Sequence, residues 1–159
     1  VYESQITPPG NSKQLSFKLV ARLAESGDRL LVGTVALNDL YGFLKDYRAE
    51  TQEIDRIFER NVRRFLGNRG RVNKRIEATL LETPERFGLF NNGITFVVTN
   101  FEPEEGGIRL INPYIVNGCQ TTRSVWNVFE RKLNSGGTAP SAELDEWRTR
   151  ASSGVVVTK

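Results

Sequence analysis

Ile115-Val116-Asn117-Gly118-Cys119-Gln120-Thr121-Thr122-Arg123 is the stretch of the sequence with the clearest local structural pattern. The apolar run over residues 114–116 predicts a short strand, and the residues after Gly118 predict a helix from about Cys119 to Leu133. The apolar stripe of this helix has the spacing of one helix face: Thr122, Trp126, Phe129 and Leu133. Asn-Gly is a strong turn former because both residues tolerate a positive φ. The stretch therefore predicts a strand, a tight turn and a helix in direct succession.

The start of this helix is suited to an anion. The first turn of a helix carries backbone N–H groups without helical partners and the positive end of the helix dipole. A phosphate-binding site is expected here, formed by Asn117, Gly118, Gln120, Thr121, Thr122 and Arg123. The alternative is that the asparagine and glycine only make the turn, while the threonines only satisfy the helix end. The stretch is not a Walker A loop, because it lacks the G-x-x-x-x-G-K-[ST] pattern.

A second Asn-Gly site lies upstream, in Phe90-Asn91-Asn92-Gly93-Ile94-Thr95. By itself this pattern is typical of a turn. Two adjacent asparagine side chains could also bond to a base, a ribose or a backbone group. Asn91, Asn92 and Gly93 are therefore added to the candidate ligand-binding residues.

Positive charge is concentrated in the middle of the chain. From Arg56 to Arg75 eight basic residues accompany only Glu59, so this basic segment carries +7 in a chain of net charge +3. The segment predicts a surface that neutralises phosphate charge, with these candidate residues: Arg60, Asn61, Arg63, Arg64, Arg71 and Asn73. The alternative is the solvated face of an ordinary amphipathic helix.

Composition excludes several classes of chemistry within this chain. The 159 residues are 38% hydrophobic and 26% charged, which is typical of one folded domain. Without histidine the chain cannot form a Ser-His-Asp triad, a Cys-His pair or a histidine-ligated zinc site, and no metal-ligand set is expected. The single cysteine, Cys119, excludes an internal disulfide and favours a cytoplasmic protein. No membrane contact is expected, because no apolar run approaches the length that spans a bilayer. The start at Val1 and the lack of methionine suggest a piece of a longer protein.

The remaining patterns predict a mixed α/β (α+β) fold with a short mixed sheet and a basic helical middle segment. Further strands are expected over residues 16–23, 30–36, 94–100, 108–110 and 155–157. Further helices are expected from Asn38 or Asp39 to about Tyr47, and over 52–66, 72–82 and 143–150. We divide the chain into an extended segment (1–14), a core (15–133), a linker (134–141) and the start of a truncated C-terminal part (142–159).

Five short motifs, in this order, resemble the abortive-infection phage-resistance (AIPR) family. They are Asn61-x-Arg63-x-x-Leu66-Gly67, Val72-Asn73-x-x-Ile76 with Thr79-Leu80, Pro84-Glu85-x-Phe87, Asn91-Asn92-Gly93-Ile94-Thr95, and Val116-Asn117-Gly118-x-Gln120-Thr121. The resemblance covers about residues 40–133. It implies a bacterial or archaeal cytoplasmic protein of anti-phage defence, of a kind often encoded near restriction–modification genes.

A more distant resemblance links the stretch 116–121 to the D-G-Q-[HQ]-R turn of ParB/sulfiredoxin-like proteins, which bind or hydrolyse nucleotides there. Asn117 stands in place of the acid, Cys119 separates Gly118 from Gln120, and Thr121 stands where histidine or glutamine would. The resemblance therefore bears on binding more than on hydrolysis. Cys119 is interpreted as a small buried residue, the alternative being a reactive cysteine of the sulfiredoxin kind.

Three functions follow as hypotheses. The first is a defence-protein domain that binds a nucleotide or nucleic-acid phosphate at the strand–turn–helix site, with Mg²⁺-assisted hydrolysis as a nucleotide hydrolase or nuclease left open. The second is a non-catalytic DNA- or RNA-binding module that uses the basic segment. The third is a structural or sensor domain, partnered by the remainder of the full-length protein, in which the asparagines are buried and hydrogen-bonded: Asn61, Asn73, Asn91 and Asn92.

Overall fold

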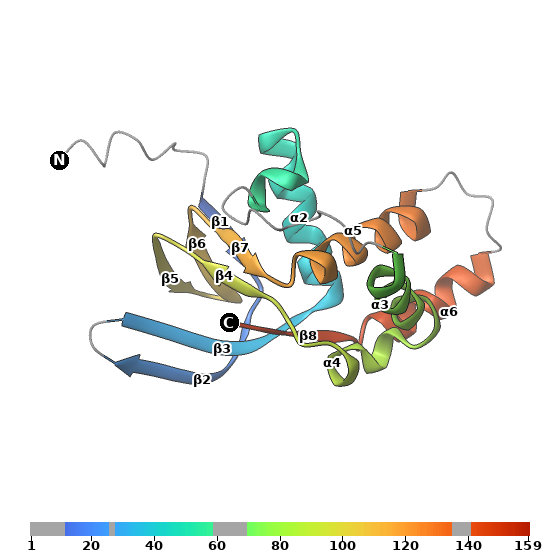
Figure 1. Cartoon of the computed structure of the whole chain (residues 1–159), viewed down its shortest axis with the longest axis horizontal. Coiled ribbons are helices and arrows are strands. Elements are labelled where there is room, and N and C mark those ends of the chain that lie inside the picture. Colours follow the sequence, from blue (N-terminus) through green and yellow to red (C-terminus); the bar gives the residue numbers. More distant parts are fainter. Residues whose placement is uncertain (1–11, 26–27, 59–69, 135–140) are drawn as a thin grey trace.

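The computed structural model of the chain describes residues 12–25, 28–58, 70–134 and 141–159. The fold class is mixed α/β, as the sequence predicts. Figure 1 shows the strands gathered at one end of the molecule and the helices α3, α4, α5 and α6 at the other. Among the described residues, none of the helices has the length and apolar character that crossing a membrane requires.

A hairpin starts the first sheet. Strands β2 (Lys18–Glu25) and β3 (Asp28–Ala36) pair antiparallel, and β8 (Val155–Thr158) joins the other edge of β3. A second, two-stranded sheet consists of β4 (Thr95–Val97) and β7 (Tyr114–Asn117). The two sheets are linked where Ile94 forms a parallel bridge with Thr158, because Ile94 N–H donates to the carbonyl of Val157 over 2.9 Å.

The third sheet contains β1 (Ser12–Leu15), β6 (Gly107–Ile111) and β5 (Asn100–Glu104), in that order and antiparallel throughout. The single short mixed sheet that the sequence predicts is thus replaced by three small antiparallel sheets, and among the described residues the parallel pairing is confined to the bridge at Ile94. The strand expected over 94–100 is divided between β4 and β5, because β4 pairs with β7 and β5 pairs with β6.

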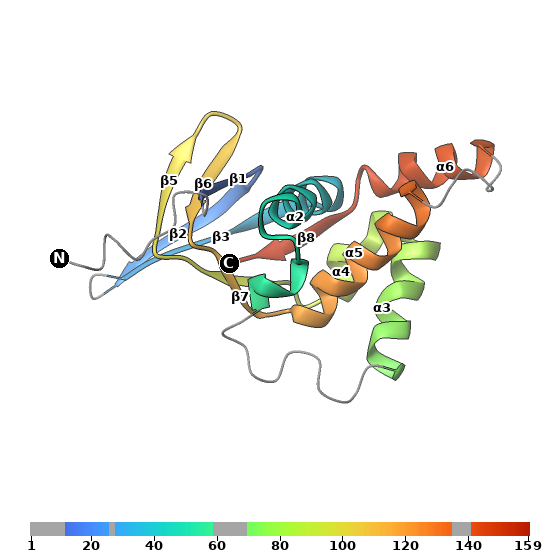
Figure 2. The same cartoon turned by 90° about the horizontal axis from the view of Figure 1, so that it is seen from above.

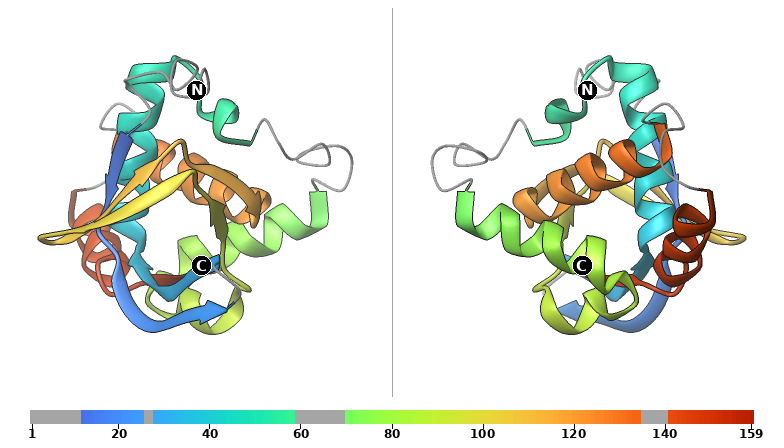
Figure 3. Two further views of the ribbon diagram at one scale, coloured as in Figure 1. Left: turned by 90° about the vertical axis from the view of Figure 1, so that its left-hand side faces the viewer. Right: turned by 90° about the vertical axis from the view of Figure 1, so that its right-hand side faces the viewer.

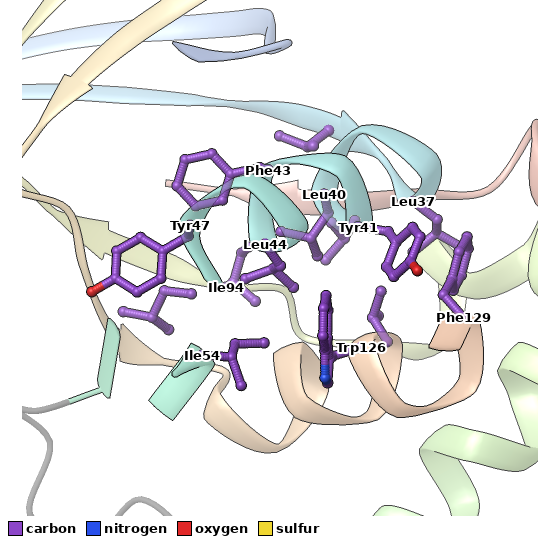
Figure 4. Packing of buried hydrophobic residues seen from close by; sticks show 14 of the residues in the cluster. Leu37, Leu40, Tyr41, Phe43, Leu44, Tyr47, Ile54, Ile94, Trp126 and Phe129 are labelled. Carbon is purple, nitrogen blue, oxygen red and sulfur yellow. The ribbon is translucent and has the colours of Figure 1, made fainter. Parts of the chain in front are cut away.

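The core lies largely between α2 (Leu37–Thr51) and α5 (Cys119–Asn134), as Figure 4 shows. The ring of Tyr41 on α2 lies 5.5 Å from that of Trp126 and 5.3 Å from that of Phe129, centroid to centroid. The Tyr41 hydroxyl donates to Oε2 of Glu130 over 2.5 Å. Burial and, after it, the bond to Glu130 raise the pKa of Tyr41 to about 12, since both disfavour the phenolate. α5 closely matches the predicted helix, and Thr122, Trp126 and Phe129 of its predicted stripe are buried.

Two predicted helix boundaries are wrong. α2 begins at Leu37 rather than after an Asn38 or Asp39 cap, because the carbonyl of Gly154 accepts the Leu37 N–H over 3.0 Å. The helix expected over 52–66 does not start at Gln52, which adopts a left-handed φ of 75° and ends α2. A 3₁₀ helix, η1 (Ile54–Phe58), follows instead, and its buried Ile54, Ile57 and Phe58 account for the helix-like spacing. Residues 59–66 lie outside the described residues.

The C-terminal elements pack into the same core. α6 (Ser141–Ala151) is held by Trp147, whose indole N–H donates to the carbonyl of Leu80 over 2.9 Å and whose ring lies 5.0 Å from that of Phe129. Leu80 belongs to α3 (Gly70–Glu82), which packs beside α5 (Figure 2). Residues 142–159 therefore share their packing with the segment 15–133.

Candidate functional site

The two Asn-Gly turns lie against each other. β4 and β7 pair so that Thr95 is opposite Asn117, which brings the chain after β7 to the chain before β4. A Cβ atom added to Gly118 would lie only 2.5 Å from the carbonyl oxygen of Gly93 and 2.9 Å from the Cα of Ile94. Gly118 has a φ of 86° and Gly93 a φ of 92°, so both use the left-handed region that favours glycine. Gly118 thus allows a close approach of backbone, whatever binds nearby.

Asn91 joins the two turns through its side chain. Its Oδ1 accepts the N–H of Gly93 over 2.8 Å, and its Nδ2 donates to Oγ1 of Thr121 over 3.0 Å. Thr121 lies in the first turn of α5 and is buried. Asn91 therefore has the hydrogen-bonded structural position that the third hypothesis assigns to the asparagines. Asn92 and Asn117 differ, because both side chains are exposed.

A pocket of about 860 Å³ opens at this junction. Three parts of the chain contribute to its wall: the middle of α3, the short helix α4 (Phe87–Phe90) with the turn that follows, and the start of α5. The right-hand view of Figure 3 shows α3 beside α5 with α4 below them. The lining residues are Arg75, Ile76, Ala78, Thr79, Phe87, Phe90, Asn91, Asn92, Gly93, Asn117, Gly118, Cys119, Gln120 and Thr121.

The charge of this pocket favours an anion. Its described lining contains one cation, Arg75, and no carboxylate. The first turn of α5 also lacks an acidic residue, so no side chain there offsets the positive end of the helix dipole. The i→i−4 hydrogen bonding of α5 begins at its first turn, since Thr122 N–H donates to the Gly118 carbonyl over 2.9 Å. Positive potential from the helix start and from Arg75 thus reaches the same space.

Two predicted phosphate-binding residues do not line the pocket. Thr122 is fully buried, and its Oγ1 donates to the carbonyl of Gly118 over 2.9 Å. Arg123 forms an ion pair with Asp55 of η1, with 2.8 Å between Nη1 and Oδ1. Thr122 thus faces the core, and the ion pair directs the Arg123 side chain toward η1, although residue 123 lies one turn after residue 120 on the same side of the helix. The structure places Asn117, Gly118, Gln120 and Thr121 beside the second predicted group, Asn91, Asn92 and Gly93.

Most of the predicted phosphate surface lies outside the described residues. These are Arg60, Asn61, Arg63 and Arg64, and nothing is described of the Arg71 side chain. Asn73 is on α3, and its Oδ1 is buried without a hydrogen-bond partner in the described part of the chain. Lys74 and Arg75 are both exposed on α3, and of these two only Arg75 lines the pocket.

The sequence reasoning missed the part of the wall that α3 and α4 supply. Arg75 is counted there only as one charge of the basic segment, and Phe87 and Phe90 are not among the candidate site residues. A signal existed for Phe90, since it directly precedes the Asn-Asn-Gly turn. No local sequence pattern indicates that α3 packs beside the two turns.

Cys119 has the buried position that its main interpretation predicts. It is 6% exposed, and its Sγ lies 3.8 Å from the carbonyl oxygen of Ile115 as a hydrogen-bond donor. The described residues contain no group of three or more cysteine, aspartate or glutamate side chains that could hold a metal ion.

A second hollow, of about 380 Å³, lies between the sheets beside Lys159 and is mainly lined by aliphatic and aromatic residues such as Phe17, Leu31 and Ile108. Its lining includes one amide and one cation, Asn100 and Lys159, but no helix begins among its lining residues, whereas the first pocket has the start of α5 together with its amides and Arg75. Ligand sites combine shape with a few converging polar groups, which favours the first pocket as the candidate site.

The model of the AIPR protein family matches residues 58–139, just over half of the chain. The matched range includes both Asn-Gly turns, α3, α4, α5 and the whole described lining of the pocket. Neither the curated proteins nor the solved structures give a match.

Proposed function

This chain belongs to the AIPR family, and we propose that it binds a nucleotide or a nucleic-acid phosphate in the pocket between α3, α4 and the start of α5. Family membership supports a role in abortive infection and phage resistance. The observation that carries the proposal is the convergence of a helix start, an arginine and two exposed asparagines on one pocket, whose described lining residues include no carboxylate.

The parts of the pocket have distinct roles in this proposal. The phosphate group lies at the first turn of α5, where Gln120 and the helix dipole stabilise its charge. Arg75 contributes a guanidinium that can bond two phosphate oxygens at once. Asn92 and Asn117 present amides that donate and accept, which suits the polar edges of a sugar or a base. Asn91 and Gly118 support the site by holding the two turns together.

The proposal is limited to binding. Mg²⁺ prefers oxygen ligands and is usually held by one or two carboxylates together with the phosphates of a substrate. The described lining of the pocket supplies no carboxylate, so these residues do not fit a protein-held magnesium ion. The proposed role, binding of a nucleotide or nucleic-acid phosphate, does not require hydrolysis. Hydrolysis would be measured separately, as phosphate released from a bound nucleotide.

Thermal unfolding of the chain tests the proposal, with NTPs, dNTPs and short DNA and RNA added at two salt concentrations. A ligand at 100 times its Kd stabilises the folded state by about 2.7 kcal/mol, which corresponds to several degrees in Tm for a domain of this size. Arg75→Gln is expected to remove most of this shift. Lys74→Gln is the matched control, because Lys74 is the adjacent exposed cation of α3 and does not line the pocket.

The same experiment separates the alternatives. Equal losses in Arg75→Gln and Lys74→Gln, with a shift only for polynucleotides that disappears at high salt, would favour the basic segment as a nucleic-acid surface. No shift with any of these ligands would contradict the proposal and leave the pocket as a consequence of packing.

A further inference from the structure

Phe90 is a largely exposed aromatic residue in the wall of the pocket. Its side chain is 62% exposed at the end of α4, whereas Phe87, one turn earlier on the same short helix, is 1% exposed and anchors α4 in the core. Burial of a phenylalanine side chain is normally favourable by a few kcal/mol, so a ring exposed at the wall of a pocket offers apolar surface that a ligand can cover.

The surroundings of Phe90 make one face of its ring available. The guanidinium of Arg86 lies over the ring, with 5.3 Å between its Cζ and the ring centroid. A cation on one side leaves the opposite side as the open face. Phe90 also belongs to the pocket lining, directly before Asn91 and Asn92, so the open ring and the exposed amide of Asn92 adjoin the same space.

A flat aromatic ring with a neighbouring amide fits one ligand chemistry well. Every nucleobase has a π-face that stacks on aromatic side chains and polar edges that bond to amides. The pocket, at about 860 Å³, is within the size range of small-molecule and cofactor sites, so phosphate and base fit together. An inorganic phosphate would use only the α5 end and would leave the ring uncovered.

We propose that Phe90 is the stacking platform for the base of the ligand, so that the pocket binds nucleotides through base and phosphate together. This inference rests on the proposed function, because it assigns the second end of the same ligand. The phosphate lies at the first turn of α5 near Arg75, the base stacks on Phe90, and Asn92 bonds to a polar edge of the base or sugar. Phe90 thereby determines specificity for nucleotides over simple anions.

Calorimetric titration of the full chain with ATP, GTP, CTP, UTP and inorganic tripolyphosphate tests this assignment. Phe90→Ala is expected to weaken nucleotide binding by about 5- to 150-fold, the cost of losing one base–aromatic stack, and to leave the Kd of tripolyphosphate unchanged. Phe90→Trp, which keeps an aromatic ring at this position, should bind nucleotides about as well as the wild type, in contrast to Phe90→Ala. Leu89→Ala is the matched control, since Leu89 is 74% exposed on the same helix and does not line the pocket.

The outcomes separate this inference from the function on which it rests. Nucleotide binding that is unchanged in Phe90→Ala, or weakened equally for tripolyphosphate, overturns the stacking role and leaves the proposed function standing. Nucleotide binding by a chain that does not bind tripolyphosphate supports the inference, provided that Phe90→Ala loses it and Leu89→Ala keeps it. A chain that binds neither the nucleotides nor tripolyphosphate overturns both.

Discussion

The two Asn-Gly turns share a dipeptide with an exposed asparagine, and they differ in the additional asparagine, Asn91, that precedes the first of them. In both turns the glycine has a positive φ, and its missing Cβ makes room for a backbone carbonyl, that of Val157 beside Gly93 and that of Gly93 beside Gly118. Before these glycines stand Asn92 and Asn117, which are exposed, whereas Asn91 is bonded to the backbone and to Thr121. The glycines thus serve the fold, and only the exposed asparagines are available to a ligand.

The first prediction tests whether backbone contact, and not ligand access, requires Gly118. Gly118→Ala is expected to destabilise the fold by about 3 kcal/mol or more, because a methyl group would meet the Gly93 carbonyl at 2.5 Å in addition to the strain of a positive φ. Chemical denaturation measures this loss.

Gly106→Ala provides the matched control for this prediction. Gly106 has a φ of 82°, and nothing lies within 4 Å of its missing Cβ, so the substitution should cost only about 1 kcal/mol of backbone strain. Similar losses in the two variants would show that the contact between the turns is unimportant.

The second prediction separates the adjacent asparagines. Asn91→Ala should destabilise the fold by about 2–3 kcal/mol, because it removes the partners of the Gly93 N–H and the Thr121 hydroxyl. Asn92→Ala should change stability by less than about 0.5 kcal/mol and weaken nucleotide binding. Urea unfolding and ligand titration on the same samples measure both quantities. A destabilised Asn92→Ala, or a neutral Asn91→Ala, would reverse the assignment of the two residues.

The third prediction uses a buried polar contact outside both turns as a reference. The pKa of Tyr41 is raised to about 12 in the folded state from its ordinary value of 10. The stability that this shift contributes is therefore fully present below pH 10 and is lost as the pH rises through 12. Tyr41→Phe should be less stable than wild type by about 1–2 kcal/mol at pH 7, and this difference should narrow between pH 10 and 12. Unfolding free energies at several pH values measure the difference. A difference that stays constant over this range would show that Tyr41 keeps an ordinary pKa.

The sequence predicts well those helices, strands and turns that are determined by their own residues. The helix at Cys119, the turns at Gly93 and Gly118 and the strand ending at Ala36 follow from periodicity and turn chemistry. The α-helix expected over residues 52–66 is wrong in its described part, up to residue 58. Ile54, Ile57 and Phe58 have a spacing that a 3₁₀ helix also buries.

The wall of the site depends on contacts between distant segments. Residues 75 and 120 line the same pocket because α3 packs on α5, and the carbonyl of Gly154, near the other end of the chain, accepts the Leu37 N–H at the start of α2. Neither contact leaves a pattern in the local sequence. The two turns could therefore be identified as candidates, whereas their joint pocket with Arg75 and Phe90 could not.

Occupation of the pocket by a nucleotide is tested most directly by NMR titration of the ¹⁵N-labelled chain with the nucleotide that gives the largest thermal shift. We expect the amide shifts to change most at residues 91–93 and 117–121, together with the side chain of Arg75. Changes confined to the remaining basic residues between 56 and 74, or spread evenly over the surface, would contradict binding in the pocket.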